Sequence, residues 1–268
     1  MRLASFVLCL SLVVPAFGAD RFVLLQSTTS TQNSGLYDAI LPAFTQATGI
    51  TVRVVAVGTG QALRNARNCD GDALLTHARE AEEAFVAAGY GAYRADVMHN
   101  DFVLVGPAAD PAAIGGGREV APALAAIAAS QAPFASRGDD SGTHIRERAL
   151  WQAAGIDPAG DSGTWYRETG SGMGATLNIA TAQGAYALTD RATWIAFANK
   201  GGHEVLVEGD PALFNQYGVV PVSQSHCPRA RAAAAERFAR WLLSPEGQAA
   251  IAGFRADGQQ LFFPNATP

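Results

Sequence analysis

The sequence lacks the short motifs that most often mark an enzyme. It contains no His-Glu-x-x-His zinc motif, no Gly-x-x-x-x-Gly-Lys phosphate loop and no Gly-x-Ser-x-Gly nucleophile turn. An exported hydrolase using Asp139 or Asp140 would need a paired base or metal ligands, which the sequence does not show. The histidines have no metal-ligand spacing, so we interpret them as polar surface or loop residues: His77, His99, His144, His203 and His226. We expect a protein that is not an enzyme and has no cofactor or protein-bound metal.

The chain also has little positive charge and no long apolar run beyond its first residues. Its 19 Lys and Arg against 24 Asp and Glu give a net charge of −5, which argues against nucleic acid and anionic membranes as partners. No later stretch reaches the ~18 apolar residues of a membrane-spanning helix. With 49% hydrophobic residues the 268-residue chain is a folded protein, with room for one large domain or two lobes.

Residues 1–19 have the pattern of a secretory signal peptide. Arg2 precedes an apolar run over residues 3–14, and small residues follow near the expected cleavage site. Cys9 lies inside the apolar run and lacks the context of a lipoprotein cleavage site, so we expect no lipid anchor. We therefore predict cleavage of this peptide and export to the periplasm.

Cysteine is scarce, and two of the three cysteines follow the signal peptide. Cys69 and Cys227 are an even pair far apart in sequence, which in an oxidising compartment could close one long loop. The alternative is two buried free thiols, and the spacing has no metal-site form. A disulfide between Cys69 and Cys227 is therefore a candidate.

What the sequence does contain is an alternation of apolar strand patterns with helical patterns. In the first half, strands are expected over residues 21–26, 50–57, 73–76 and 102–106, with helices over 36–48, from 61 and over 80–88. A turn-rich passage follows Gly106. Beyond it we expect helices over 121–130, 142–154, 175–182, 191–199, 229–243 and 245–252, and strands over 133–136, 184–188, 204–207 and 217–222. This alternation predicts a doubly wound α/β sheet.

Two loops at strand ends early in the chain are rich in hydrogen-bond donors. Ligands of open α/β sheets bind outside the carboxyl ends of the strands. Residues 27–31 carry five consecutive hydroxyls, more than the one that helix capping needs, and predict an anion cradle. Residues 58–61 offer flexible backbone and the Thr59 hydroxyl, although glycine there is as often only a tight turn.

Two further loops of this kind lie in the second half. In residues 136–144, Arg137 supplies a planar fork of donors for an oxyanion, and Ser141 and Thr143 bracket a helix start. Arg137 can equally pair with Asp139 or Asp140 while Ser141 caps the helix, and the two interpretations are compatible. Residues 168–176 contain Gly-x-Gly-x-Gly, which is not the dinucleotide spacing, but whose glycines let backbone amides approach a small ligand.

Several segments together resemble the periplasmic tungstate-binding proteins of tungstate ABC importers. They are Ser-Thr-Thr-Ser-Thr-Gln-Asn-Ser-Gly-Leu at 27–36, Leu-Pro-Ala-Phe-x-x-x-Thr-Gly-Ile at 41–50, Val-Gly-Thr-Gly-Gln-Ala-Leu at 57–63 and Ser-Arg-Gly-Asp-Asp-Ser-Gly-Thr-His at 136–144. Further matches lie at 74–78, 169–177 and 186–193, so the resemblance covers essentially the whole chain after the signal peptide.

The resemblance implies a type II periplasmic binding protein fold, in which two doubly wound α/β lobes are joined by crossing strands. We assign residues 20–101 and 217–268 to lobe 1 and residues 102–216 to lobe 2. It also implies a monomer that captures tungstate, with molybdate as a second possible ligand, in the cleft between the lobes and delivers it to a membrane permease. The alternative is a receptor for phosphate or another tetrahedral oxyanion, because residues 137–143 also look like a loop of phosphate-binding proteins.

The site residues implied by the resemblance fall on the four loops. The family's Thr-Thr-Thr-Ser motif falls on residues 27–30, where Ser27 replaces the first threonine and keeps its hydroxyl. The family's arginine and threonine ligands fall on Arg137 and Thr143, and the glycine-rich loop supplies amides. The predicted ligand-binding residues are Thr28, Thr29, Ser30, Thr59, Arg137, Ser141, Thr143, Met173 and Gly174.

Overall fold

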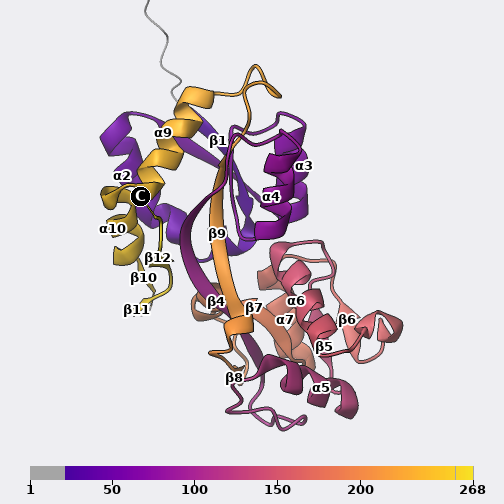
Figure 1. Cartoon of the computed structure of the whole chain (residues 1–268). Coiled ribbons are helices and arrows are strands. Elements are labelled where there is room, and N and C mark those ends of the chain that lie inside the picture. The colour runs from indigo at the N-terminus through magenta and orange to yellow at the C-terminus, as the bar shows by residue number, and fades with distance from the viewer. Residues whose placement is uncertain (1–21, 257, 268) are drawn as a thin grey trace, which may run out of the picture.

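Two long strands connect the two bodies of the molecule. The structure is a computed structural model that describes residues 22–256 and 258–267, so the predicted signal peptide with Cys9 lies outside the described residues. Strands β4 (Ala95–Pro107) and β9 (Phe214–Pro221) pair antiparallel and run side by side from the larger body to the smaller one (Figure 1). No helix within 22–256 and 258–267 is long and apolar enough to cross a membrane.

The larger body is built on a mixed sheet with the strand order β12-β4-β9-β3-β1-β2. Its first three strands, β1 (Phe22–Thr28), β2 (Thr51–Val57) and β3 (Ala73–Thr76), pair in parallel, whereas β9 runs antiparallel to β3. The helices of this body are α1 (Thr29–Asn33), α2 (Leu36–Thr48), α3 (Thr59–Arg67), α4 (Arg79–Ala87), α9 (Ala232–Leu243) and α10 (Pro245–Gly253). Short strands complete it: β10 (Arg255–Ala256), β11 (Gln259–Gln260) and β12 (Phe263–Pro264).

The smaller body forms around the second half of β4. Strands β7 (Ala187–Asp190) and β8 (His203–Val207) pair antiparallel with β4, and β5 (Phe134–Ser136) pairs in parallel with β6 (Tyr166–Glu168). Its helices are α5 (Val120–Ser130), α6 (Gly142–Ala153), α7 (Met173–Gln183) and α8 (Arg191–Ala196), with two short 3-10 turns, η1 (Pro158–Asp161) and η2 (Pro211–Leu213).

Each body has its own hydrophobic core. In the larger body Leu25, Phe44 and Phe238 belong to one buried cluster, and in the smaller body Phe134 and Trp151 belong to another. Burying apolar side chains is the main force that holds each body together. Five large aromatic residues are also buried: Phe85, Trp151, Trp165, Trp194 and Trp241.

Several elements differ from the sequence prediction: β6, β10, β11 and β12 were not expected, and β7 and β9 have other bounds than the strands expected over 184–188 and 217–222. The strand expected over residues 102–106 is the end of the much longer β4. The sequence pattern predicted only this end, because the polar residues His99, Asn100 and Asp101 interrupt the apolar pattern of the strand. The hydroxyl-rich loop contains the short helix α1, which begins directly after β1. The sheet is also only partly parallel, because the crossing strands return against the direction of β3.

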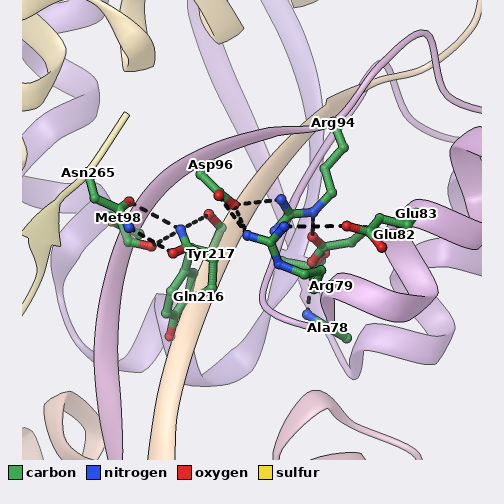
Figure 2. Close-up of polar contacts among 11 residues, drawn as sticks. Ala78, Arg79, Glu82, Glu83, Arg94, Asp96, Met98, Gln216, Tyr217 and Asn265 are labelled. Carbon is green, nitrogen blue, oxygen red and sulfur yellow. Dashed lines mark hydrogen bonds and ion pairs between the residues drawn. The ribbon is translucent and has the colours of Figure 1, made fainter. Parts of the chain in front are cut away.

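An ion-pair network fixes the crossing strands to α4 (Figure 2). Arg94 Nε lies 2.7 Å from Glu82 Oε2, and Arg94 Nη1 lies 2.5 Å from Asp96 Oδ1. Arg79 Nη2 reaches the same aspartate at 2.6 Å. A Cβ on Gly218 of β9 would lie 2.5 Å from Glu82 Oε2, so only glycine lets the strand pass this close. Breaking a buried pair is costly, so the network holds the base of both strands in place.

A disulfide joins Cys69 and Cys227 inside the larger body. Cys69 follows the end of α3, and Cys227 lies in the segment between β9 and α9. The His226 imidazole lies beside the two sulfurs, and these three residues are the one cluster of metal-ligating type in the described part of the chain. Both sulfurs are used by the disulfide bond, so the cluster offers no thiolate to a metal ion.

Candidate functional site

The four donor-rich loops meet where the two bodies touch. Gly142 N–H, at the start of α6, donates a hydrogen bond of 3.0 Å to Thr59 Oγ1, at the start of α3. On the other side, Thr29 Oγ1 in α1 lies 3.8 Å from the position that a Cβ on Gly172 would occupy, just before α7. Four helices therefore point their N-termini at one region, and helix N-termini attract anions through their free amides and their dipoles.

The hydroxyls of the first loop have different roles. Thr28 Oγ1 lies 2.8 Å from Thr31 Oγ1 and 3.1 Å from Ser30 Oγ, and it accepts the Thr31 N–H as the cap of α1. Thr29 is the exception, because its Oγ1 is buried and has no hydrogen-bond partner among the described residues. Buried hydroxyls are normally hydrogen-bonded, so the unpaired Thr29 hydroxyl indicates a donor held for a ligand.

The start of α6 shows the same division between a structural and an unpaired hydroxyl. Ser141 Oγ caps the helix by accepting the His144 N–H at 3.2 Å. Thr143 is fully buried, and its Oγ1 has no partner within the described part of the chain. Thr29 and Thr143 therefore present unsatisfied hydroxyls from opposite bodies.

Arg137 is buried next to the fourth loop and is already paired. Only 2% of the residue is exposed, Nη2 lies 2.5 Å from Asp139 Oδ2, and Nε donates to the Ser171 carbonyl at 3.3 Å. Burial lowers the pKa of Arg137 from its ordinary value, and the carboxylate of Asp139 opposes that shift. The ion pair expected as one interpretation of this loop is present, and it orients the guanidinium without using all five of its donors.

The fourth loop contributes backbone rather than side chains. No side chain of the described residues caps α7, whose N-cap is Gly172. Met173 is fully buried in a cluster with Val103 and Leu177, so its side chain packs inward. A Cβ on Gly174 would lie 3.8 Å from Asn33 Nδ2, which places this turn against α1. Backbone amides at a helix start without a side-chain cap are the usual donors to a bound anion.

One histidine of this region, His77, was not among the predicted ligand-binding residues. The assignment of the histidines to surface or loop positions is wrong for His144 in α6 and His203 in β8, which are buried, whereas His77 lies in the loop after β3 but is only 7% exposed. His77 directly follows β3, its Nε2 lies 3.4 Å from Ser30 Oγ, and its Nδ1 has no partner among the described residues. The rule that ligands lie beyond strand ends applies to β3 as well and would have identified it.

A groove lies outside this cluster. It has a volume of about 840 Å³, runs along α6, and is lined by residues that include Ile145, Arg148 and Tyr166 but none of the nine predicted ligand-binding residues. The volume of this groove is therefore no guide to the position of the hydrogen-bond donors. The buried cluster of hydroxyls, amides and one guanidinium is suited to a small ion that only accepts hydrogen bonds.

Known proteins resemble the chain over nearly all of its length. Residues 15–246 match the PBP superfamily domain. The tungstate-binding protein TupA of Peptoclostridium acidaminophilum is 46% identical over 248 residues, which cover 91% of this chain and 86% of that protein. The structure of the tungstate-binding protein TupA from Desulfovibrio alaskensis G20 is 48% identical, covers 92% of this chain and 99% of that chain, and superimposes with a TM-score of 0.78.

A second solved structure is similar to this chain over most of its length. The crystal structure of the tungstate ABC transporter from Geobacter sulfurreducens is 44% identical, covers 87% of this chain and 98% of that chain, and gives a TM-score of 0.80. The prediction of an α/β, type II periplasmic binding fold is confirmed by these matches.

Proposed function

The chain belongs to the TupA family of tungstate-binding proteins, and we propose that it is the solute-binding protein of an ABC importer, capturing tungstate between two lobes. The lobes are residues 20–101 with 217–268, and residues 102–216. The protein acts in the periplasm as a monomer and passes the ion to a membrane permease. It changes no covalent bond of the ion, so its function is capture and release.

The main support for this proposal is that the Thr29 and Thr143 hydroxyls have no partner within residues 22–256 and 258–267. A buried donor without a partner costs about 1 to 3 kcal/mol, so these two groups destabilise the structure unless a ligand accepts from them. Tungstate is fully deprotonated at neutral pH and offers oxygen acceptors only. It therefore satisfies hydroxyls, amides and the Arg137 guanidinium together, whereas a protonated phosphate would also need an acceptor.

Further ligands are proposed on the same loops. Thr28, Ser30, Thr59 and Ser141 hold the hydroxyl network and the contact between the bodies, and the amides at Met173 and Gly174 face the ion from the second lobe. Contacts between the bodies support closure around it: Thr193 Oγ1 donates to the Ser30 carbonyl at 3.4 Å, and Gly60 N–H donates to the Asp140 carbonyl at 3.4 Å.

The size of the ion sets the expected selectivity. Sulfate is smaller, so its oxygens fail to reach every donor, and each donor left unpaired in the closed site costs about 1 to 3 kcal/mol. Molybdate is almost the same size as tungstate, so we expect it to bind as well.

Titration calorimetry with tungstate, molybdate, sulfate and phosphate tests the proposal. The wild-type protein should bind tungstate at micromolar concentration or below and bind sulfate at least ~100-fold more weakly. R137A should lose most of the tungstate affinity, and R240A, which removes an exposed arginine paired with Glu236, should keep it. Absence of tungstate binding by the wild type, or tighter binding of phosphate, would overturn the proposal. Light scattering should show a monomer.

A further inference from the structure

His77 lies against both lobes at the proposed anion site. It belongs to the first lobe, at the end of β3, and its Nε2 lies 3.4 Å from Ser30 Oγ. Its other edge meets the second lobe, since a Cβ on Gly142 would lie 2.7 Å from His77 Cε1 and 2.9 Å from Nδ1. The imidazole thus touches the residues next to Thr29 and Thr143, the two threonines with unpaired hydroxyls. Nδ1 itself is buried and has no partner in the described part of the chain.

The groups around the ring keep it neutral in this structure. Burial lowers the pKa of His77 to about 4, and the charges of Arg137, at the end of β5, and Arg146, on α6, act in the same direction. The side chain of Asn215 on β9 acts in the opposite direction and raises the pKa of His77. The Tyr217 ring of β9, with its centroid 5.0 Å away, stays neutral because burial raises its pKa well above its ordinary value.

The remaining neighbours of the ring do not titrate. Phe102 of β4 has its ring centroid 6.1 Å from that of His77, and the Ser30 hydroxyl belongs to α1. The carboxylates of this region act on Arg137 instead: Asp139 pairs with it, and the charges of Asp190 and Glu147 also raise its pKa. Among the described residues, the charges with the largest effect on the ring are therefore the cations Arg137 and Arg146 and not a carboxylate.

We propose that His77 is a positioning residue of the oxyanion site, which takes up one proton when a tetrahedral dianion binds and donates a hydrogen bond to it from Nδ1. The inference rests on the proposed function. The proton comes from solvent and returns to solvent when the ion leaves, so no other reactant is needed. An opposite charge within about 4 to 6 Å moves a pKa by one to three units, and the ion carries two such charges.

The consequence is a binding affinity that rises as the pH falls. When binding is coupled to the uptake of one proton, the dissociation constant changes by up to tenfold for each pH unit between the pKa of the free and of the bound protein. We therefore expect tighter tungstate binding at pH 6 than at pH 8. A site built only from hydroxyls, amides and arginine would show no such dependence over this range.

Calorimetry at pH 6, 7 and 8 in buffers of different ionisation enthalpy measures the proton uptake directly. The wild type should take up more protons per tungstate than H77Q, most of all at pH 6, and H77Q should bind with a weaker dependence on pH. H203Q is the matched control, because His203 is also 7% exposed and also has an unpaired buried Nδ1, but it lies on β8. Its proton uptake should equal that of the wild type.

Glu147 needs a separate control because burial raises its pKa to about 7 and its charge acts on Arg137. It can therefore take up part of a proton when the anion binds. E147Q should remove this part of the proton uptake. The difference in proton uptake that is due to His77 should remain. If E147Q removes the whole uptake and H77Q none, the inference about His77 is wrong.

Nitrogen NMR of the imidazole gives a readout that a purely structural histidine would not change. At pH 6 the His77 ring should be neutral without tungstate and should gain imidazolium character with saturating tungstate, with its signals assigned by their loss in H77Q. If H77Q does not fold, H77N supplies the assignment. A ring that stays neutral in the saturated wild type overturns the inference.

The two proposals fail in distinguishable ways. If the wild type binds no tungstate at any pH, the proposed function is wrong and this inference is wrong with it. If the wild type binds tungstate, but H77Q takes up as many protons as the wild type, only the role of His77 is wrong.

Discussion

Thr59 Oγ1 and the Gly142 N–H form a hydrogen bond of 3.0 Å that joins the starts of α3 and α6 across the two bodies. Both residues are buried, so the contact excludes water. The bond forms only because Gly142 has no side chain, since a Cβ there would lie 2.9 Å from Thr59 Oγ1 and 2.7 Å from His77 Cε1. Such distances are shorter than a van der Waals contact.

G142A should therefore hold the two bodies apart. Because the added methyl group collides with residues of the other body, we expect tungstate to bind at least ~10-fold more weakly. Small-angle scattering should also show less compaction on addition of tungstate than in the wild type. G160A is the matched control, because a Cβ on Gly160 meets no atom within 4 Å. Equal affinity of G142A and the wild type would contradict the role given to this contact.

T143V should weaken binding without weakening the fold. The substitution keeps the shape of the side chain and removes a buried hydroxyl that has no partner among the described residues, so the unfolding free energy should stay equal or rise. The affinity for tungstate should fall about 10- to 100-fold, because a hydrogen bond to a charged group is lost. Thermal unfolding and calorimetry measure the two effects.

T48V provides the comparison for this result. Thr48 Oγ1 donates to the Phe44 carbonyl inside α2, away from the proposed site, so its loss should lower stability slightly and leave tungstate affinity unchanged. A T143V protein that is much less stable but binds tungstate normally would show that the Thr143 hydroxyl serves the fold and not the ligand.

The sequence predicted the parts of the site that follow from strand ends. The loops after β1, β2 and β5 carry hydroxyls, glycine and Arg137 directly beyond apolar runs, and the structure brings these loops together. The sequence did not distinguish Thr29 from Thr28. All five hydroxyls look alike in the sequence, but the turn of α1 directs Thr28 Oγ1 to Thr31 and leaves Thr29 Oγ1 without a partner in the part of the chain that the structure describes.

His77 and β4 show why the rest was missed. Histidine is polar, so its burial depends on packing between residues far apart in sequence, such as Ser30 and Gly142. The first half of β4 has polar residues and lacks the apolar pattern that predicts a strand. It forms a strand because its backbone pairs with β9, and this pairing does not depend on the side-chain pattern. Both features depend on tertiary contacts that local patterns do not encode.

Removing the disulfide should lower stability but not affinity. The C69S/C227S protein loses a crosslink between residues 158 positions apart, so we expect the unfolding free energy to fall by about 2 to 5 kcal/mol in denaturant titrations. Tungstate affinity should change less than ~3-fold, since Cys69 follows the end of α3 opposite to Thr59. Adding a reductant to this variant should have no further effect, which separates the bond from other thiol chemistry. A large loss of affinity would show that the disulfide shapes the site.

Glu147 makes stability depend on pH. It is 2% exposed and accepts a hydrogen bond of 2.7 Å from the Tyr166 hydroxyl, and burial raises its pKa from 4.5 to about 7. A raised carboxyl pKa means that folding favours the protonated form. The resulting stabilisation is complete below pH 4.5, the value for the unfolded chain, and is lost as the pH rises through 7.

E147Q should therefore flatten this dependence. Between pH 5 and pH 8 the wild type should lose about 2 to 3 kcal/mol of unfolding free energy more than E147Q, because the variant has no proton to release. Urea titrations at pH 5, 6, 7 and 8 measure the difference. E204Q, which changes an exposed glutamate of β8, should keep the wild-type slope. Parallel pH profiles for E147Q and the wild type would mean that Glu147 stays charged in the folded protein, and its negative charge would then oppose a dianion bound at Arg137 throughout this range.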